Sequence, residues 1–188
     1  MTTRFEGLGY ADTLPLGFER LERLPEGAAL AGLNQETQQV LVADASLDEQ
    51  RGHAEKKSDE EHELAEDLQR VEFKVNVLIQ LVARLLKRDD DLPPVRSVRL
   101  HAEGIEWLPA AGEDVRAGLG VVSLHASRHF PQPLMLPGRI LGTHADGEGT
   151  WVRFAFEGLT PSVTELLERL VFRHHRRLVA GTRSSPRG

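Results

Sequence analysis

VRSVRLHAEGIEW, residues 95–107, alternates between apolar and polar side chains. From residue 98 to residue 102 every second position is apolar, with charged or polar residues between: Val98, Leu100 and Ala102 against Arg99 and His101. A period of two is typical of a β-strand with one buried face. Gly104-Ile105-Glu106-Trp107 follows at once and predicts the partner strand of a hairpin.

Three further segments after this hairpin have the composition of strands: residues 115–125, 134–143 and 151–156. The second is interrupted at Pro137-Gly138, where a bulge or an edge position is expected. An Asp-Gly turn at residues 145–149 leads into the third, whose apolar face carries Val152, Phe154 and Phe156. Five or six short strands at this spacing predict a small closed barrel.

A helix is predicted after the strands. Ser162 with Glu165 three residues later forms a capping box, which marks a helix start. The apolar residues that follow recur at helical spacing and predict one buried side: Val163, Leu166, Leu167, Leu170, Val171 and Leu178. The helix ends in the basic run Arg173–Arg177. That run could hold an anionic partner, but cations also stabilise a helix C-terminus by roughly 0.3–1 kcal/mol each, and we favour this structural interpretation.

A second, longer helix is predicted before the barrel, over residues 58–92. Ser58 and Glu61 form a capping box at its start, and Pro93-Pro94 forbid its continuation. Apolar residues recur between them at alternating spacings of four and three: Leu64, Leu68, Val71, Val75, Leu78, Val82 and Leu85. We call these seven residues the heptad seam, because the pattern is that of a coiled-coil helix.

Two interpretations of the heptad seam remain open. The helix could lie on its own domain, or it could associate with copies of itself. Ile79, Leu81 and Leu86 widen the apolar face in the second half of the helix. A two-stranded coil has no use for apolar residues there, whereas a bundle of three or more helices does. The pattern therefore favours self-association of more than two chains.

The N-terminal region, residues 1–57, carries weaker patterns. Residues 14–18, LPLGF, predict an extended segment that docks on another part of the protein. Asn34 is expected to cap a short helix that runs through Leu41 to about residue 45. The chain is thus divided into an N-terminal docking region at 1–57, an oligomerisation helix at 58–92 and a barrel with its C-terminal helix at 93–188.

Composition narrows the function classes. The net charge of −6 argues against a general nucleic-acid binder. The chain has no cysteine, which excludes disulfides and thiolate metal sites and fits a cytoplasmic protein. Its first residues lack the pattern of a signal peptide, and its most apolar stretch, residues 75–86, is too short to span a membrane. We therefore expect a cytoplasmic protein that does not insert into membranes.

Catalytic and metal-binding patterns are not found in the sequence. Ser123 and His125 lie two apart on a predicted strand without an acid to orient the histidine. Neither His125 with Arg128 and His129 nor the turn with His144, Asp146 and Glu148 needs a metal to explain it. We therefore expect no cofactor, no metal and no enzymatic activity.

The barrel half resembles the PilZ family, bacterial domains of which many bind cyclic di-GMP. The matching stretches are residues 98–105, 133–140, 152–159 and 167–177. With Asp12–Leu16 and the long helix before the barrel, the whole chain resembles the atypical, tetrameric PilZ subfamily of xanthomonads and related bacteria. The resemblance implies an α+β fold with a six-stranded antiparallel PilZ-like barrel, a homotetramer held by the heptad helix, and a regulatory role in surface behaviour or virulence.

The ligand motifs of the resembled family are altered here. Ligand-binding members hold phosphate and guanine with two arginines four apart before the first strand, and with Asp/Asn-x-Ser-x-x-Gly on that strand. The second motif reads Arg99-x-His101-x-x-Gly104, so only the glycine is retained. Residues 89–91 before it are aspartates. Arg84 and Arg88 have the spacing of the arginine pair, but we interpret them as a charged helix end.

These observations predict a non-catalytic regulatory adaptor that acts through an unknown signalling protein and does not bind cyclic di-GMP by the usual mode. The alternative is a cyclic di-GMP receptor with a rearranged site that uses Arg96, Arg99 and His101. In the first interpretation Arg99 and His101 face solvent, so that Arg99→Ala changes the free energy of unfolding by about 0.5 kcal/mol or less.

Overall fold

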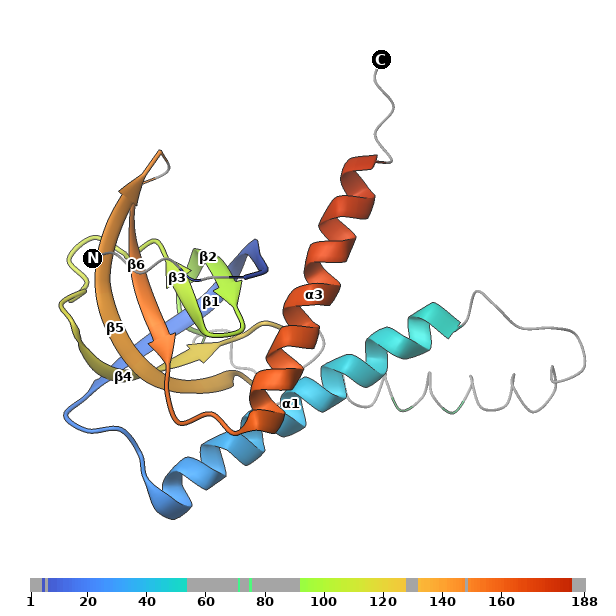
Figure 1. Cartoon of the computed structure of the whole chain (residues 1–188), viewed down its shortest axis with the longest axis horizontal. Helices are drawn as coiled ribbons and strands as arrows, with labels where there is room; N and C mark the ends of the chain where they lie inside the picture. The colour runs from blue at the N-terminus through green and yellow to red at the C-terminus, as the bar shows by residue number, and fades with distance from the viewer. Residues whose placement is uncertain are drawn as a thin grey trace, which may run out of the picture.

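A computed structural model describes residues 5, 7–53, 71, 75, 92–127, 132–147 and 149–183; for 46–53 and 178–183 it describes the backbone alone. The elements are β1 (Gly9–Leu21), α1 (Gly27–His53), β2 (Val95–His101), β3 (Gly104–Trp107), β4 (Gly118–Leu124), β5 (Leu134–Asp146), β6 (Gly149–Phe156) and α3 (Pro161–Arg183) (Figure 1). No described helix is long and apolar enough to cross a membrane.

Six antiparallel strands close into a barrel in the order β1-β2-β3-β6-β5-β4. The predicted α+β fold with a six-stranded barrel is thereby confirmed. The alternation of β2 also holds, since Val98 and Leu100 are fully buried. The predicted hairpin is present, with Leu100 opposite Ile105 and Val98 opposite Trp107.

The first strand of the barrel comes from the N-terminal region, which the sequence did not predict. β1 pairs with β2 through residues 9–15 and with β4 through residues 16–21. The segment 14–18 is extended as expected, but it is built into the barrel wall instead of docking on it. Leu14 and Leu16 point into the core for this reason. The barrel therefore draws strands from both sides of residues 58–92.

The irregularity in β5 lies beyond the predicted Pro137-Gly138. These two residues pair regularly with β4, opposite Val121 and Gly120. The register shifts instead between Ile140 and Gly142. Gly142 has a φ of +142°, a conformation that favours glycine.

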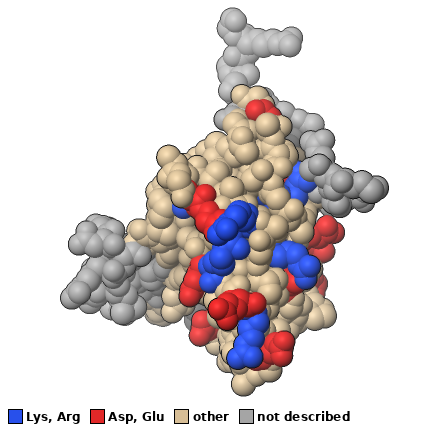
Figure 2. Space-filling model, turned by 90° about the vertical axis from the view of Figure 1, so that its left-hand side faces the viewer, with Lys and Arg blue, Asp and Glu red and all other residues tan. Residues whose placement is uncertain are grey.

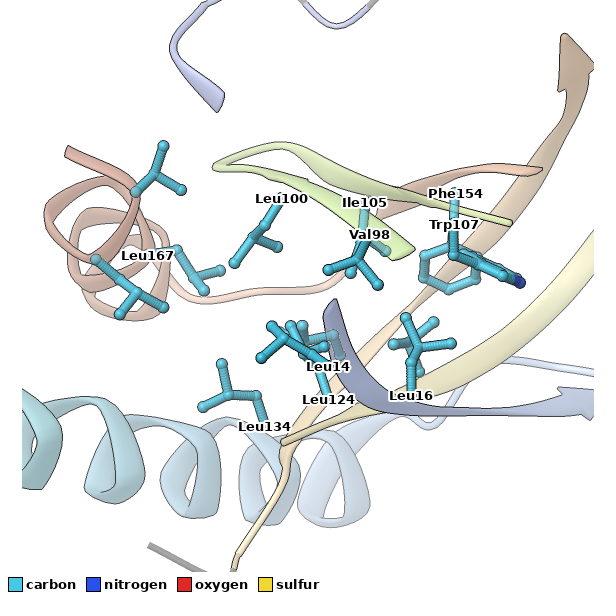
Figure 3. Packing of buried hydrophobic residues seen from close by; sticks show 14 of the residues in the cluster. Leu14, Leu16, Val98, Leu100, Ile105, Trp107, Leu124, Leu134, Phe154 and Leu167 are labelled. Atoms are coloured by element: carbon cyan, nitrogen blue, oxygen red, sulfur yellow. The ribbon is translucent and has the colours of Figure 1, made fainter. Parts of the chain in front are cut away.

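The barrel interior holds the core, and two helices close one end of it. Figure 3 shows Leu16, Trp107 and Phe154 together inside the barrel, with Leu167 of α3 approaching Leu100. The predicted apolar side of α3 is confirmed for four residues that are 2% exposed or less: Val163, Leu167, Leu170 and Val171. The helix begins one residue earlier than predicted, at Pro161, and its cap is Thr160, whose Oγ1 accepts a hydrogen bond from Val163 N at 3.4 Å.

The docking face of α1 combines polar and apolar residues, since Asn34, Thr37, Val40 and Leu41 are all buried. Thr37 is fully buried, and its hydroxyl both donates to Met135 O (3.0 Å) and accepts from Met135 N (3.1 Å) at the start of β5. Leu41 lies four residues on and is 2% exposed. Asp44 accepts a hydrogen bond from Arg173 of α3 at 3.1 Å. Hydrogen bonds as well as apolar contact thus hold α1 on the barrel and α3.

The prediction that Asn34 caps α1 is wrong, because the helix begins seven residues earlier at Gly27. Its amide instead joins α1 to the start of α3. Asn34 Nδ2 donates to Gly158 O at 3.0 Å, and its Oδ1 accepts from Thr160 N at 2.8 Å. Asn34 is 5% exposed, so its polar atoms depend on these bonds.

We expect Asn34→Ala to lower the free energy of unfolding by about 1–3 kcal/mol, because the backbone groups of Gly158 and Thr160 lose their partner. Gln38→Ala is the matched control, since Gln38 is exposed on the same helix. It should change stability by less than about 0.5 kcal/mol in the same urea titration. Equal effects of the two substitutions would contradict the joining role of Asn34.

Candidate functional site

A row of alternating charges crosses the outer face of three neighbouring strands. Arg99 of β2 lies opposite Glu106 of β3, and Glu106 lies opposite Arg153 of β6. Residues that alternate with Val98, Ile105 and Val152 must face away from the core, so the three charged side chains share the outer face.

Glu106 and Arg153 form a buried ion pair. Arg153 Nε donates to Glu106 Oε1 at 2.8 Å, and each residue is 6% exposed. His144 of β5 adds to the pair, since its Nδ1 lies 3.3 Å from Arg153 Nη2 and 3.9 Å from Glu106 Oε1. A charge removed from water to this degree requires an opposite charge beside it. Glu106 and Arg153 therefore each need the other as a counter-charge.

Arg99 is held by two groups from the β5–β6 hairpin. Its Nη1 donates to Asp146 Oδ2 at 2.6 Å, and its guanidinium lies 3.9 Å from the ring centroid of Trp151. Trp151 Nε1 donates to the other oxygen of Asp146 at 2.9 Å. The side chain of Arg99 is 29% exposed. The expectation that Arg99 faces solvent without a partner is therefore wrong.

His101 is covered by an aromatic ring from the N-terminus. The ring of Phe5 lies 5.2 Å from the imidazole, at an interplanar angle of 34°. Burial is the main cause that lowers the pKa of His101 from its ordinary value, although the Glu106 and Glu103 carboxylates oppose the shift. The imidazole therefore stays neutral near pH 7, and the expectation that it faces solvent is wrong as well.

These residues line a cavity of about 660 Å³. It is bounded by Phe5, Arg99, His101, Glu106, His144, Asp146 and Arg153. The two guanidinium groups and the two carboxylates bring its formal charge to zero. Basic and acidic side chains are likewise interspersed over the face of the molecule in Figure 2. Such a cavity is suited to a neutral ring or side chain, and it offers no surplus positive charge to a phosphate.

Arg99 and His101 of the altered motif line this cavity, whereas Gly104 and Arg96 do not. Arg96 instead forms an ion pair with Glu113, and its side chain is 11% exposed. Arg173 of the basic run pairs with Asp44 at 3.1 Å. Within the described part of the chain, no group of three or more acidic, histidine or cysteine side chains is arranged to hold a metal.

Several predicted residues fall outside the described ranges. They include Arg84, Arg88, Arg128, His129 and most of the heptad seam with its flanks Ile79, Leu81 and Leu86. Of the seam, Val71 and Val75 are described; both are helical, and they are 57% and 46% exposed. Self-association through the seam stays a prediction.

Glu106, Arg153 and Phe5 were missed as site residues. Arg153 and Glu106 each carried a signal, because a charged residue stands between core positions in their strands. The register between β3 and β6, which pairs them, is not readable from either strand alone. Phe5 lies far in the sequence before β2, whose His101 it covers, and no local pattern marks it.

The chain is similar to a known family and to a solved structure. The family model described as "Atypical PilZ domain, cyclic di-GMP receptor" matches residues 41–184. A solved structure of a pathogenic protein from Xanthomonas campestris has a TM-score of 0.69 and 26% identity, over 93% of this chain and 91% of that chain. That protein is described as a new tetrameric PilZ domain self-assembled via an unusual helical bundle. The curated proteins contain no match.

We expect Arg99→Ala to lower the free energy of unfolding by about 1–2 kcal/mol, because Trp151 loses a cation over its ring and Asp146 loses its ion pair. The matched control is Arg116→Ala, which removes a surface pair from a side chain that is 85% exposed. It should cost much less, because an ion pair at this exposure is weak. Chemical denaturation of both variants measures the free energy of unfolding. A loss for Arg99→Ala no larger than the loss for the control would show that the contacts of Arg99 with Asp146 and Trp151 do not stabilise the barrel.

Proposed function

The chain belongs to the atypical PilZ domain family, and on this premise we propose that it is a non-catalytic regulatory adaptor that does not bind cyclic di-GMP by the usual mode. It acts through protein partners in the cytoplasm, in bacterial signalling, motility or virulence. The absence of cysteine and of any recognisable catalytic pattern supports this role.

One observation carries the proposal: both arginines of the cavity are already paired with carboxylates. Arg153 holds Glu106 at 2.8 Å, and Arg99 holds Asp146 at 2.6 Å. Cyclic di-GMP carries two phosphate charges and would have to take these cations from their partners. Breaking the buried pair leaves Glu106 as an uncompensated charge, which costs several kcal/mol. The cavity therefore opposes a dianionic ligand.

The alternative is a cyclic di-GMP receptor with a rearranged site. The volume of about 660 Å³ and the presence of Arg99 and His101 on its wall favour this alternative. Arg96 does not contribute, because it pairs with Glu113 elsewhere. Of its three residues, the alternative thus keeps only the neutral His101 and Arg99, whose guanidinium already pairs with Asp146.

We expect isothermal titration of the full chain to show no saturable heat with cyclic di-GMP up to roughly 100 µM, a concentration that corresponds to a binding free energy of about −5.5 kcal/mol. A PilZ domain with both intact ligand motifs serves as the positive control under the same buffer. A stoichiometric titration of this chain would favour the receptor and overturn the adaptor.

The adaptor is proposed to be a homotetramer held by the heptad seam. Val71 and Val75 support this, because both are helical and about half exposed in the single chain. An apolar stripe of this kind is usually covered by a partner. The similar Xanthomonas campestris protein, which assembles as a tetramer through a helical bundle, supports the same stoichiometry.

Light scattering should give a mass near four times the 20.9 kDa of one chain at micromolar concentration. Val71→Glu with Val75→Glu should lower it toward the monomer, because charges are excluded from the interior of a helical bundle. The barrel should remain folded by circular dichroism, since neither valine belongs to its core.

Asn76→Glu with Gln80→Glu is the matched control, since it adds two carboxylates at positions outside the predicted seam. It should leave the mass unchanged. A monomer mass for the unmodified chain, or equal loss of assembly in both variants, would contradict assembly through the seam.

A further inference from the structure

The N-terminal residues before β1 lie against the β2–β3 turn. We call Phe5, Gly7 and Leu8 the N-terminal strap. Gly7 has a φ of +122°, a conformation open to glycine, which turns the chain between Phe5 and the start of β1. Phe5 is half-buried and does not belong to the hydrophobic core, and Leu8 is 42% exposed. The strap therefore rests on the finished barrel and is not needed to fill its interior.

Three residues from three strands form a seat for the Phe5 ring. His101 of β2 lies under it at 5.2 Å between ring centroids, and the Arg153 guanidinium of β6 lies 5.8 Å from its centroid. Gly104 of β3 leaves the remaining space, because a Cβ atom there would lie 2.2 Å from Phe5 Cζ; the same Cβ would also lie 2.4 Å from the backbone oxygen of Phe154. We call His101, Gly104 and Arg153 the ring seat. The one residue retained from the family's ligand motif thus admits a ring from the same chain.

The strap borders two hollows. Phe5 lines the cavity of about 660 Å³ with Arg99 and His144. Gly7 and Leu8 line a second hollow of about 450 Å³ with Ala102 and Glu103 of the β2–β3 turn and with Phe172 of α3. Phe172 is 54% exposed, so this hollow is bordered by apolar surface that no described residue covers fully. The strap crosses between the two hollows over one turn.

We propose that the strap is the internal occupant of a peptide-binding groove, and that a partner protein docks there with an extended segment whose aromatic side chain replaces Phe5 in the ring seat. This rests on the proposed function as an adaptor for protein partners. The present occupant sets the chemistry of the partner, because it is an aromatic side chain on a segment that leads into an extended strand. A cavity with no surplus positive charge favours such a side chain over a phosphorylated ligand.

Displacement of the strap makes the groove switchable. A tethered segment faces its seat at an effective concentration of roughly millimolar, so it excludes weakly binding segments until they exceed that level. A partner segment that makes contacts in both hollows can bind more tightly than the strap and displace it from the ring seat. Loss of the Phe5 ring should therefore open the ring seat to segments that the unmodified chain rejects.

Saturation-transfer NMR tests the proposal with the full chain and with its Phe5→Ala variant. The probe is the synthetic peptide TTRFEGL, residues 2–8, at about 1 mM, near the expected effective concentration of the strap. Saturation of the peptide's ring protons should be about twofold stronger with Phe5→Ala than with the unmodified chain, because peptide and strap compete at about equal concentration in the unmodified chain. Leu141→Ala, which alters a 46% exposed residue of β5 that lines neither hollow, should behave like the unmodified chain.

Two outcomes would overturn the proposal. Equal saturation with the unmodified chain and with Phe5→Ala would show that Phe5 does not occupy the site of the peptide. If Phe5→Ala bound cyclic di-GMP and the unmodified chain did not, the ring seat would be a nucleotide site that Phe5 blocks. The proposed function of the unmodified chain would then still stand. Phe5→Leu, which keeps an apolar side chain without a ring, is the second variant and should show the same gain if the seat selects rings.

Discussion

The buried pair of Glu106 and Arg153 is the constraint on which the outer wall of the barrel depends. The two residues lie opposite each other on β3 and β6, and neither can lose its partner without leaving a charge in a site that is 6% exposed. The pair positions His144 beside it and carries the Phe5 ring over Arg153. The register of β3 and β6 brings these two charges together, and with Arg99 and Asp146 they make the cavity neutral.

The altered motif makes sense once these contacts are considered together. Arg99 replaces an acidic or amide residue of the ligand motif and forms an ion pair with Asp146 across the wall. His101 replaces serine and lies against a ring, and a side chain at Gly104 would collide both with that ring and with the backbone oxygen of Phe154. A site that receives a dianionic ligand in other family members is satisfied here by groups of the chain itself.

The sequence predicted the elements whose signal is local. Alternation found β2, β3 and β6, and helical spacing found the buried side of α3. β1 was not recognised as a strand because Pro15 and Gly17 interrupt it and its two halves pair with different strands. α1 was predicted too short because it docks partly through Asn34 and Thr37, which carry no apolar pattern. The partners of Arg99 and Arg153 lie 47 residues away in each case, so only the barrel's register reveals them.

A double-mutant cycle on Glu106 and Arg153 tests most directly whether these two buried residues neutralise each other in the barrel wall. Glu106→Gln and Arg153→Gln should each lower the free energy of unfolding by about 3–5 kcal/mol, since each leaves a buried charge unpaired. The double variant leaves none, so its loss should be smaller than the sum of the single losses by about 1–3 kcal/mol. Losses that add to within about 0.5 kcal/mol would show that the two residues act independently, and would contradict this account of the site.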